Sequence, residues 1–498
     1  IQQEKSKGSC LTGSMGMKVD EWAVWYSGDP QRLANYYSRQ ILRNTPNGRY
    51  WSQLDKEERS NVVHEPLAAD IAQVSANLLF SEPADIQYED QGKSGDRIRQ
   101  FTEKNGLHSK MLEGAELAAA MGGVYFKLDT NPDISDVPIV TTKTPEMAIP
   151  EFTSGRLTGV TFWRIIAMDD NKDKVYRLFE HRTNQAGTLI VLYELFEGNK
   201  DHIGRKIDLG AFEETKGYQD VSYSNFQGLG CVYIPNVLPN RLYPGSSQGM
   251  ADYADCISML DSLDETMTSW IRDLTLGQAR IFADSEMFNS SLPVDPNFPS
   301  MSGESSSRFD PFHRIYQKID MAGWKLDGGS AKPIEQVQFD IRVEEHSRTA
   351  NELVEKIVSR SGYAPQSFGL NIDGRAESGT ALRLRERKSL LTQAKKARYW
   401  APQLSRLFFE AQQLDQATRL SGSYEIQDVT VVPSDSISES RTEIAATVRD
   451  LKAAEAISTY MSVKMAHPDW TEEVIQEEVD RINQEKGAMP LPEYQIGG

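Results

Sequence analysis

The serine-containing segment at residues 245–249 is the best candidate for covalent catalysis. It reads GSSQG and matches the G-x-S-x-G pattern, in which a nucleophilic serine, here Ser247, sits on a sharp turn between a strand and a helix. The preceding residues, NVLPNRLYP, contain Pro239 and Pro244 and predict a loop instead of the buried strand that a hydrolase needs. The sequence therefore favours Ser246 or Ser247 as the N-cap of a following helix.

Carboxylates, histidines and cysteines could hold a metal ion, but their spacing gives no recognisable site. Asp252 with Asp255 and Asp261 with Asp264 are helical neighbours, and an acidic surface is the better interpretation of them. The seven histidines occur singly, His64 stands in HEP, and the three cysteines lack a zinc spacing. Neither G-x-x-x-x-G-K-S/T nor G-x-G-x-x-G is present. We therefore expect no catalytic, metal or cofactor site and a protein that is not an enzyme.

Composition limits the classes of protein to which the chain can belong. Its 498 residues predict about two to four domains, and 54 Lys and Arg against 72 Asp and Glu give a net charge of -18. So acidic a surface repels nucleic acid and anionic membranes, and any contact with DNA must be local or weak. The longest apolar run, around Leu189–Tyr193, is far shorter than the ~20 residues of a membrane helix, and no secretory signal opens the chain. We expect a soluble protein.

The first half of the chain mixes helical and strand patterns. Residues 20–80 are helical in pattern, with Val63, Leu67 and Ile71 on one apolar face, and a further helix ends at the glycine pair Gly122 and Gly123. Five apolar segments separated by turn residues then predict strands: VYFKLDT, VPIVTTKT, GVTFWRIIA, KVYRLFEH and TLIVLYELF. This half is therefore expected to be α+β.

The second half begins with two long amphipathic helices. An apolar stripe predicts one helix over 249–276, and a second is expected from Val343 to a cap at Gly362, with the i,i+4 pairs Glu344–Arg348 and Glu352–Lys356. Between them, a polar stretch at 289–307 and the strand patterns ARIFA, FHRIYQKI and IEQVQFDI predict a small excursion from the body. Two more helices are expected between Ser438 and Lys486.

A glycine-rich loop at 362–378 precedes a strongly basic helix. We expect this helix over 379–414, with a kink at Pro402. Between Arg383 and Arg406, Glu386 is the single acid against eight cations, which are Arg383, Arg385, Arg387, Lys388, Lys395, Lys396, Arg398 and Arg406.

Taken in order, these elements resemble the portal proteins of long-tailed double-stranded-DNA bacteriophages. The resemblance covers about Trp22 to Leu414 and rests on the order of the elements rather than on one motif. The matching stretches are LLFSEPADI, GGVYFKLD, ADYADCISMLDSLDETMTSWIRDLTLGQARIF, and APQSFGL followed by SGTALRLRERK.

The resemblance implies a ring, usually of twelve copies, at a capsid vertex, through which double-stranded DNA is packaged and ejected. It implies contacts with the major capsid protein, the large terminase subunit and the head-tail adaptor, and a location in the virion after assembly in the host cytoplasm. The implied regions are a flexible N-terminal tail (1–16), an α+β wing (17–248), a first stem helix (249–276), a clip (277–333), a strand with the second stem helix (334–361), a tunnel loop (362–378), a basic helix (379–420), and a crown with C-terminal helices (421–498).

The glycine-rich loop falls where the family has its tunnel loop. A mobile constriction is therefore implied, and an ordinary packed connection is the alternative. A mostly acidic conduit suits translocation, because tight neutralisation of the DNA phosphates would hold the duplex in place. The tunnel-loop residues are Gln366, Ser367, Phe368, Gly369, Leu370, Asn371, Ile372, Asp373, Gly374 and Arg375.

The cations of the basic helix could contact DNA in the tunnel or pair with carboxylates of the same and adjacent subunits. Leucines surround them, which predicts a packed helix and favours pairing with carboxylates. We expect this helix mainly to hold subunits together and to anchor the loop, through Arg383, Arg385, Arg387, Lys388, Lys395, Lys396 and Arg398.

Two other functions remain open. A different virion scaffold or adaptor protein is the first, although adaptors are usually much smaller and lack an insertion between two long helices. The second is a serine hydrolase built around Ser247.

Overall fold

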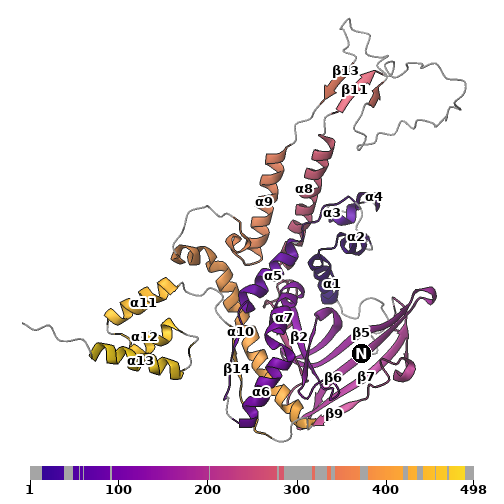
Figure 1. Cartoon of the computed structure of the whole chain (residues 1–498). Helices are drawn as coiled ribbons and strands as arrows, with labels where there is room; N and C mark the ends of the chain where they lie inside the picture. The colour runs from indigo at the N-terminus through magenta and orange to yellow at the C-terminus, as the bar shows by residue number, and fades with distance from the viewer. Residues whose placement is uncertain are drawn as a thin grey trace, which may run out of the picture.

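A computed structural model of the chain shows an α+β body, a projecting helical hairpin and a small C-terminal helical group (Figure 1). The structure describes residues 14–38, 49–54, 56–59, 61–89, 92–200, 202–277, 280–284, 317–319, 334–337, 342–370, 379–418, 424–433, 441–454, 456–467, 470 and 472–487.

A large antiparallel sheet forms one side of the body. Its strands are β4 (Ala148–Thr153), β5 (Arg156–Asp169), β6 (Lys174–Gln185), β7 (Thr188–Gly198) and β8 (Arg205–Ile207) in that order, and β9 (Val221–Ser224) also pairs with β7. The segments GVTFWRIIA, KVYRLFEH and TLIVLYELF, which predicted strands, correspond to β5, β6 and β7, so this prediction is confirmed.

A second sheet carries much of the central core. It has the order β10-β2-β3, with β10 at Cys231–Pro235, β2 at Gly123–Asp129 and β3 at Ile139–Lys143, all antiparallel. Phe126 of β2 meets Trp400 in an edge-to-face contact at 5.9 Å between ring centroids, and Phe80 meets the same indole at 4.9 Å. The sheet is thus joined to helices from both ends of the chain.

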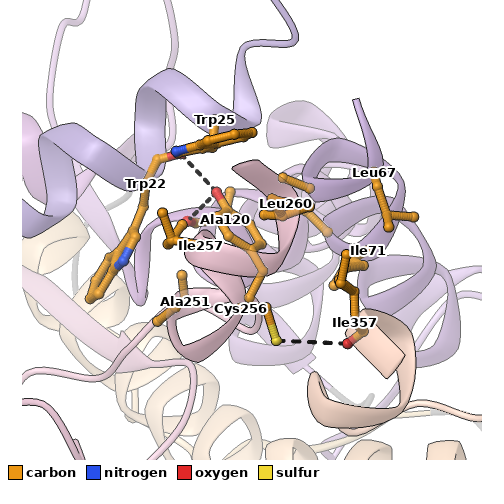
Figure 2. Packing of buried hydrophobic residues seen from close by; sticks show 14 of the residues in the cluster. Trp22, Trp25, Leu67, Ile71, Ala120, Ala251, Cys256, Ile257, Leu260 and Ile357 are labelled. Atoms are coloured by element: carbon orange, nitrogen blue, oxygen red, sulfur yellow. Dashed lines mark hydrogen bonds between the residues drawn. The ribbon is translucent and has the colours of Figure 1, made fainter. Parts of the chain in front are cut away.

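Most of the N-terminal helices pack around the base of the hairpin, whereas the helix at Gly92–Asn105 packs into a separate core cluster with Phe408. The N-terminal helices are α1 (Ser14–Tyr26), α2 (Pro30–Ser38), α3 (Tyr50–Gln53), α4 (Lys56–Arg59), α5 (Leu67–Phe80), α6 (Gly92–Asn105) and α7 (Leu107–Met121). Figure 2 shows Trp22 and Trp25 of α1 in the same buried cluster as Ile71 of α5 and Ile357. Residues 14–16 of the expected N-terminal tail belong to α1, which begins at Ser14, and residues 1–13 lie outside the described residues. Val63 precedes α5 instead of joining its apolar face.

Two long helices, α8 (Ile257–Leu276) and α9 (Val343–Arg360), run side by side out of the body (Figure 1). Beyond their far ends lies a three-stranded sheet of order β12-β11-β13, made of β11 (Arg280–Asp284), β12 (Gln317–Ile319) and β13 (Ile334–Val337). Of the two predicted ion pairs on α9, Glu352–Lys356 is present at 3.3 Å, whereas Arg348 pairs with Glu352 at 3.8 Å. The polar stretch at 289–307 lies outside the described residues.

The start of α8 differs from the prediction. The helix begins at Ile257 instead of Gly249, after a 3-10 turn at Ala254–Cys256, and neither Ser246 nor Ser247 caps it. The reason is tertiary: the buried Tyr253 hydroxyl reaches the carbonyl oxygens of Trp22 at 2.8 Å and Ala120 at 2.9 Å. These contacts hold the segment before Ile257 against α1 and α7.

The C-terminal part returns to the body before ending in a separate helical group. The basic helix α10 (Gly379–Ala417) contains Pro402, and β14 (Thr430–Val432) pairs antiparallel with β1 (Asp85–Gln87). Three helices follow instead of the two expected: α11 (Arg441–Ala453), α12 (Thr459–Ala466) and α13 (Glu472–Gly487). Their small core contains Val463, Ile475 and Val479. None of the helices in the described ranges is long and apolar enough to span a membrane.

Candidate functional site

The junction where α9 meets α10 contains most of the residues that the sequence singled out. The polypeptide leaves α9 at Arg360, turns through the short 3-10 helix Pro365–Phe368, and re-enters regular structure in α10. Gly362 has φ 100° just after α9, the left-handed geometry expected of a glycine that ends a helix, so the predicted cap is confirmed.

Lys396 of α10 is buried and forms the centre of this junction. Its ammonium donates to Asp252 Oδ2 at 2.6 Å, to Ser75 Oγ at 2.6 Å and to the Tyr363 hydroxyl at 3.0 Å. The same carboxylate accepts from the Tyr363 hydroxyl at 2.6 Å and from Asn236 Nδ2 at 2.8 Å. One ion pair therefore ties α5, α10, the segment before α8 and the segment after α9 together.

This burial corrects the role expected for Lys396. Its side chain is 2% exposed, and its carboxylate partner, Asp252, belongs to the same chain. A cation so enclosed contacts neither DNA nor a neighbouring subunit. Sequence reasoning missed the network because the local sequence TQAKKARYW does not distinguish the inward-facing Lys396 from the adjacent, exposed Lys395.

The remaining cations of α10 lie in different environments. Lys388 donates to Ser359 at the end of α9, to the backbone carbonyl and to Oγ at 2.9 Å, and so fastens the two helices together. Arg387, Lys395 and Arg398 are exposed. The side chains of Arg383 and Arg385 lie outside the described residues.

The first half of the expected tunnel loop is packed against α10. Ser389 Oγ accepts from the Ala364 backbone N–H at 2.8 Å and lies 2.8 Å from Ser367 Oγ. Phe368 meets the ring of Tyr363 edge-on, with centroids 6.2 Å apart. Gly369 at φ 71° ends the 3-10 helix Pro365–Phe368, and residues 371–375 lie outside the described residues.

The aspartates that were considered as metal ligands interact with donor groups of the protein itself. Asp264 is fully buried and accepts from Trp51 Nε1 at 2.9 Å and from the Glu65 N–H at 3.0 Å, with His64 Nδ1 at 2.8 Å. Burial raises the pKa of Asp261 to about 6. Among the described residues, no three His, Cys, Asp or Glu side chains gather where a metal ion would need them.

Ser247 lies in a loop beside a groove. The hydrolase pattern requires the serine to sit on a turn between a strand and a helix, and the loop does not have this arrangement. The described residues that line this groove include neither a histidine nor a carboxylate to act as a general base. The geometry therefore does not support a serine nucleophile.

Glu410 of α10 is fully buried beneath Arg406. The Arg406 Nε donates to Glu410 Oε1 at 2.7 Å, while Oε2 has no hydrogen-bond partner within the described part of the chain. Burial raises the pKa of Glu410 to about 7, although Arg406 acts to lower it.

This raised pKa predicts a pH dependence of stability. The pKa of Glu410 in the folded state lies above its value in the unfolded state. The stabilising contribution of the protonated Glu410 is therefore complete below about pH 4.5 and is lost as the pH rises through about 7. We expect Glu410 to cost on the order of 3 kcal/mol of stability between pH 4.5 and 8, and Glu410→Gln to remove that cost. Thermal unfolding of both proteins from pH 4.5 to 8 measures it, and a constant difference in Tm would contradict the assignment.

Comparison with known proteins identifies the family. A family model described as phage portal protein, SPP1 Gp6-like, matches residues 18–489, nearly the whole chain. A search of curated proteins found no match. The matched range includes the helical hairpin, the sheet at its tip, and the α9–α10 junction, in the order that the sequence indicated. This chain therefore belongs to the SPP1 Gp6-like family of phage portal proteins.

Proposed function

We propose that twelve copies of this chain close into a ring at one capsid vertex and that DNA enters and leaves the capsid through its centre. Membership of the portal family already implies an oligomeric ring that contacts the capsid and DNA. The structural observation that carries the proposal is the hairpin of α8 and α9 with a small sheet beyond its far ends (Figure 1). An adaptor or scaffold role does not account for this projecting hairpin.

Each structural part then has a place in the ring. The paired helices α8 and α9 form the stem, and the sheet of β11, β12 and β13 belongs to the clip. The N-terminal helices, the sheet of β4–β9 and the sheet of β10, β2 and β3 form the wing, and α11–α13 form the crown. In this arrangement the clip meets the large terminase subunit during packaging and the head-tail adaptor afterwards, while the wing contacts the major capsid protein.

The cations of α10 divide into two groups under this proposal. Lys396 and Lys388 hold the wing, stem and loop of one subunit together through Asp252 and Ser359. The exposed Arg387, Lys395 and Arg398 pair with the acidic surfaces of neighbouring copies, and Arg383 and Arg385 have the same proposed role.

Changes in the loop between α9 and α10 test whether the ring is a DNA conduit. We propose that residues 366–375 line the tunnel, with Gln366–Leu370 as the anchored part held by Ser389. Deleting residues 371–374 should leave ring assembly unchanged, because the anchoring contacts lie outside the deletion, and should lower DNA packaging or retention at least tenfold.

Packaged DNA per capsid, measured by nuclease protection, gives the readout. The matched control replaces the same four residues with glycine and serine and so keeps the length of the loop. If the deletion packages DNA as the intact protein does, the loop is an ordinary connection and the tunnel assignment is wrong.

A further inference from the structure

A groove of about 880 Å³ lies between the β4–β5 hairpin, β10 and α10. The hairpin turns at Ser154 and Gly155, both with positive φ, and brings Phe152 and Leu157 to one side of the groove. Leu229 and Leu238 contribute further apolar surface, and Tyr399 of α10 lies opposite. The interior therefore suits an apolar side chain.

The charged residues of this groove all have the same sign. Arg156, Arg398 and Arg406 line it, and its lining within the described residues contains no Asp or Glu, although the chain carries 72 acids against 54 basic residues. No ion pair between described residues involves Arg156 or Arg398, and Arg406 engages Glu410 through Nε alone. The groove is therefore complementary to a partner that combines carboxylates with an apolar group.

The loop between β2 and β3 has that combination. Ile134 is 75% exposed, the most exposed large apolar side chain in the described part of the chain, and Asp133 and Asp136 flank it on an exposed surface. The loop is held firmly: Arg97 Nη2 donates to the Asp136 carbonyl oxygen at 2.6 Å, and Lys104 Nζ donates to Asp136 Oδ1 at 2.6 Å. Ile134 is therefore exposed on a loop that these hydrogen bonds hold in place.

The two surfaces are formed by different parts of one sheet. In the order β10-β2-β3, residues of β10 line the groove, whereas the Ile134 loop joins the central strand β2 to β3. Two different surfaces of complementary chemistry on one subunit make a heterologous contact, and repetition of such a contact by rotation closes a ring.

We propose that the Ile134 loop of one subunit docks into the arginine-lined groove of its neighbour. Ile134 enters the apolar interior, and Asp133 pairs with Arg398 or Arg156 at the rim. The inference rests on the proposed ring. DNA fits the groove less well, because phosphates would match the arginines but leave the apolar lining without a partner.

Cysteine cross-linking tests the contact. The double variant Ile134→Cys, Gln403→Cys should form covalent dimers and higher multimers on mild oxidation, because Gln403 lines the groove. The control, Ile134→Cys with Lys206→Cys, places the second thiol on exposed β8 and should not cross-link. The natural Cys231 in the groove is buried, and burial raises its pKa to about 12, which keeps it unreactive.

A charge exchange provides the second arm. Arg398→Glu and Asp133→Arg should each weaken assembly at low salt, and the two together should restore it. Intact rings without cross-links would overturn this inference while leaving the ring proposal standing, and a wild-type protein that stays monomeric would overturn both. Normal assembly of Arg398→Glu with lost DNA binding would assign the groove to DNA and so contradict the docking.

Discussion

Replacing Lys396 with alanine should lower the free energy of unfolding by about 3–5 kcal/mol, the largest effect that we expect from a single substitution. The change leaves Asp252 buried and charged without its cation, since the remaining donors, Tyr363 and Asn236, are neutral. It also removes the hydrogen bond from Lys396 of α10 to Ser75 of α5. Chemical denaturation of the assembled protein measures the loss.

Two variants separate the ion pair from other causes. Lys172→Ala changes an exposed lysine outside α10 and should alter stability by about 0.5 kcal/mol or less. Lys396→Met combined with Asp252→Leu removes both charges and should recover much of the loss, because a buried pair contributes little net stability compared with apolar packing. Equal losses for Lys172→Ala and Lys396→Ala would contradict a specific role of the Lys396–Asp252 pair.

Deleting residues 289–307 should abolish DNA packaging while the protein still folds and forms rings. In the sequence the segment falls between β11 and β12, and the hairpin of α8 and α9 packs into the body through Ile257, Leu260 and Ile357. Those contacts do not include the deleted residues, so stability should change little. Packaging should fall to background, because the clip is where we propose that the large terminase subunit docks.

The packaging assay needs a control for length alone. A variant with residues 289–307 replaced by a glycine-serine chain of equal length keeps the spacing between β11 and β12 but loses the sequence. Loss of packaging in both variants would assign docking to the sequence of this segment. Packaging by the deletion variant at the normal level would contradict the clip assignment.

The sequence predicted most elements because local patterns govern them. The apolar run TLIVLYELF corresponds to β7, and the glycine pair after AELAAAM ends α7. The hairpin of α8 and α9 with a strand-containing excursion between them was also readable, because both helices carry amphipathic patterns.

The start of α8 and the burial of Lys396 could not be predicted in the same way. Both depend on partners that are distant in the sequence: Tyr253 is fixed by Trp22, 231 positions away, and Lys396 by Asp252, 144 positions away. A basic helix with one inward lysine has the same local pattern as one with every cation on the surface. Only the packing of α10 against α5 distinguishes them.

The mass and shape of the purified, assembled protein test the ring most directly. Native mass spectrometry should give a closed oligomer with the mass of twelve chains, and electron microscopy of the same sample should show a ring with an open central channel. A protein that remains monomeric or dimeric across salt concentrations, or that forms open filaments instead of rings, would contradict the proposal.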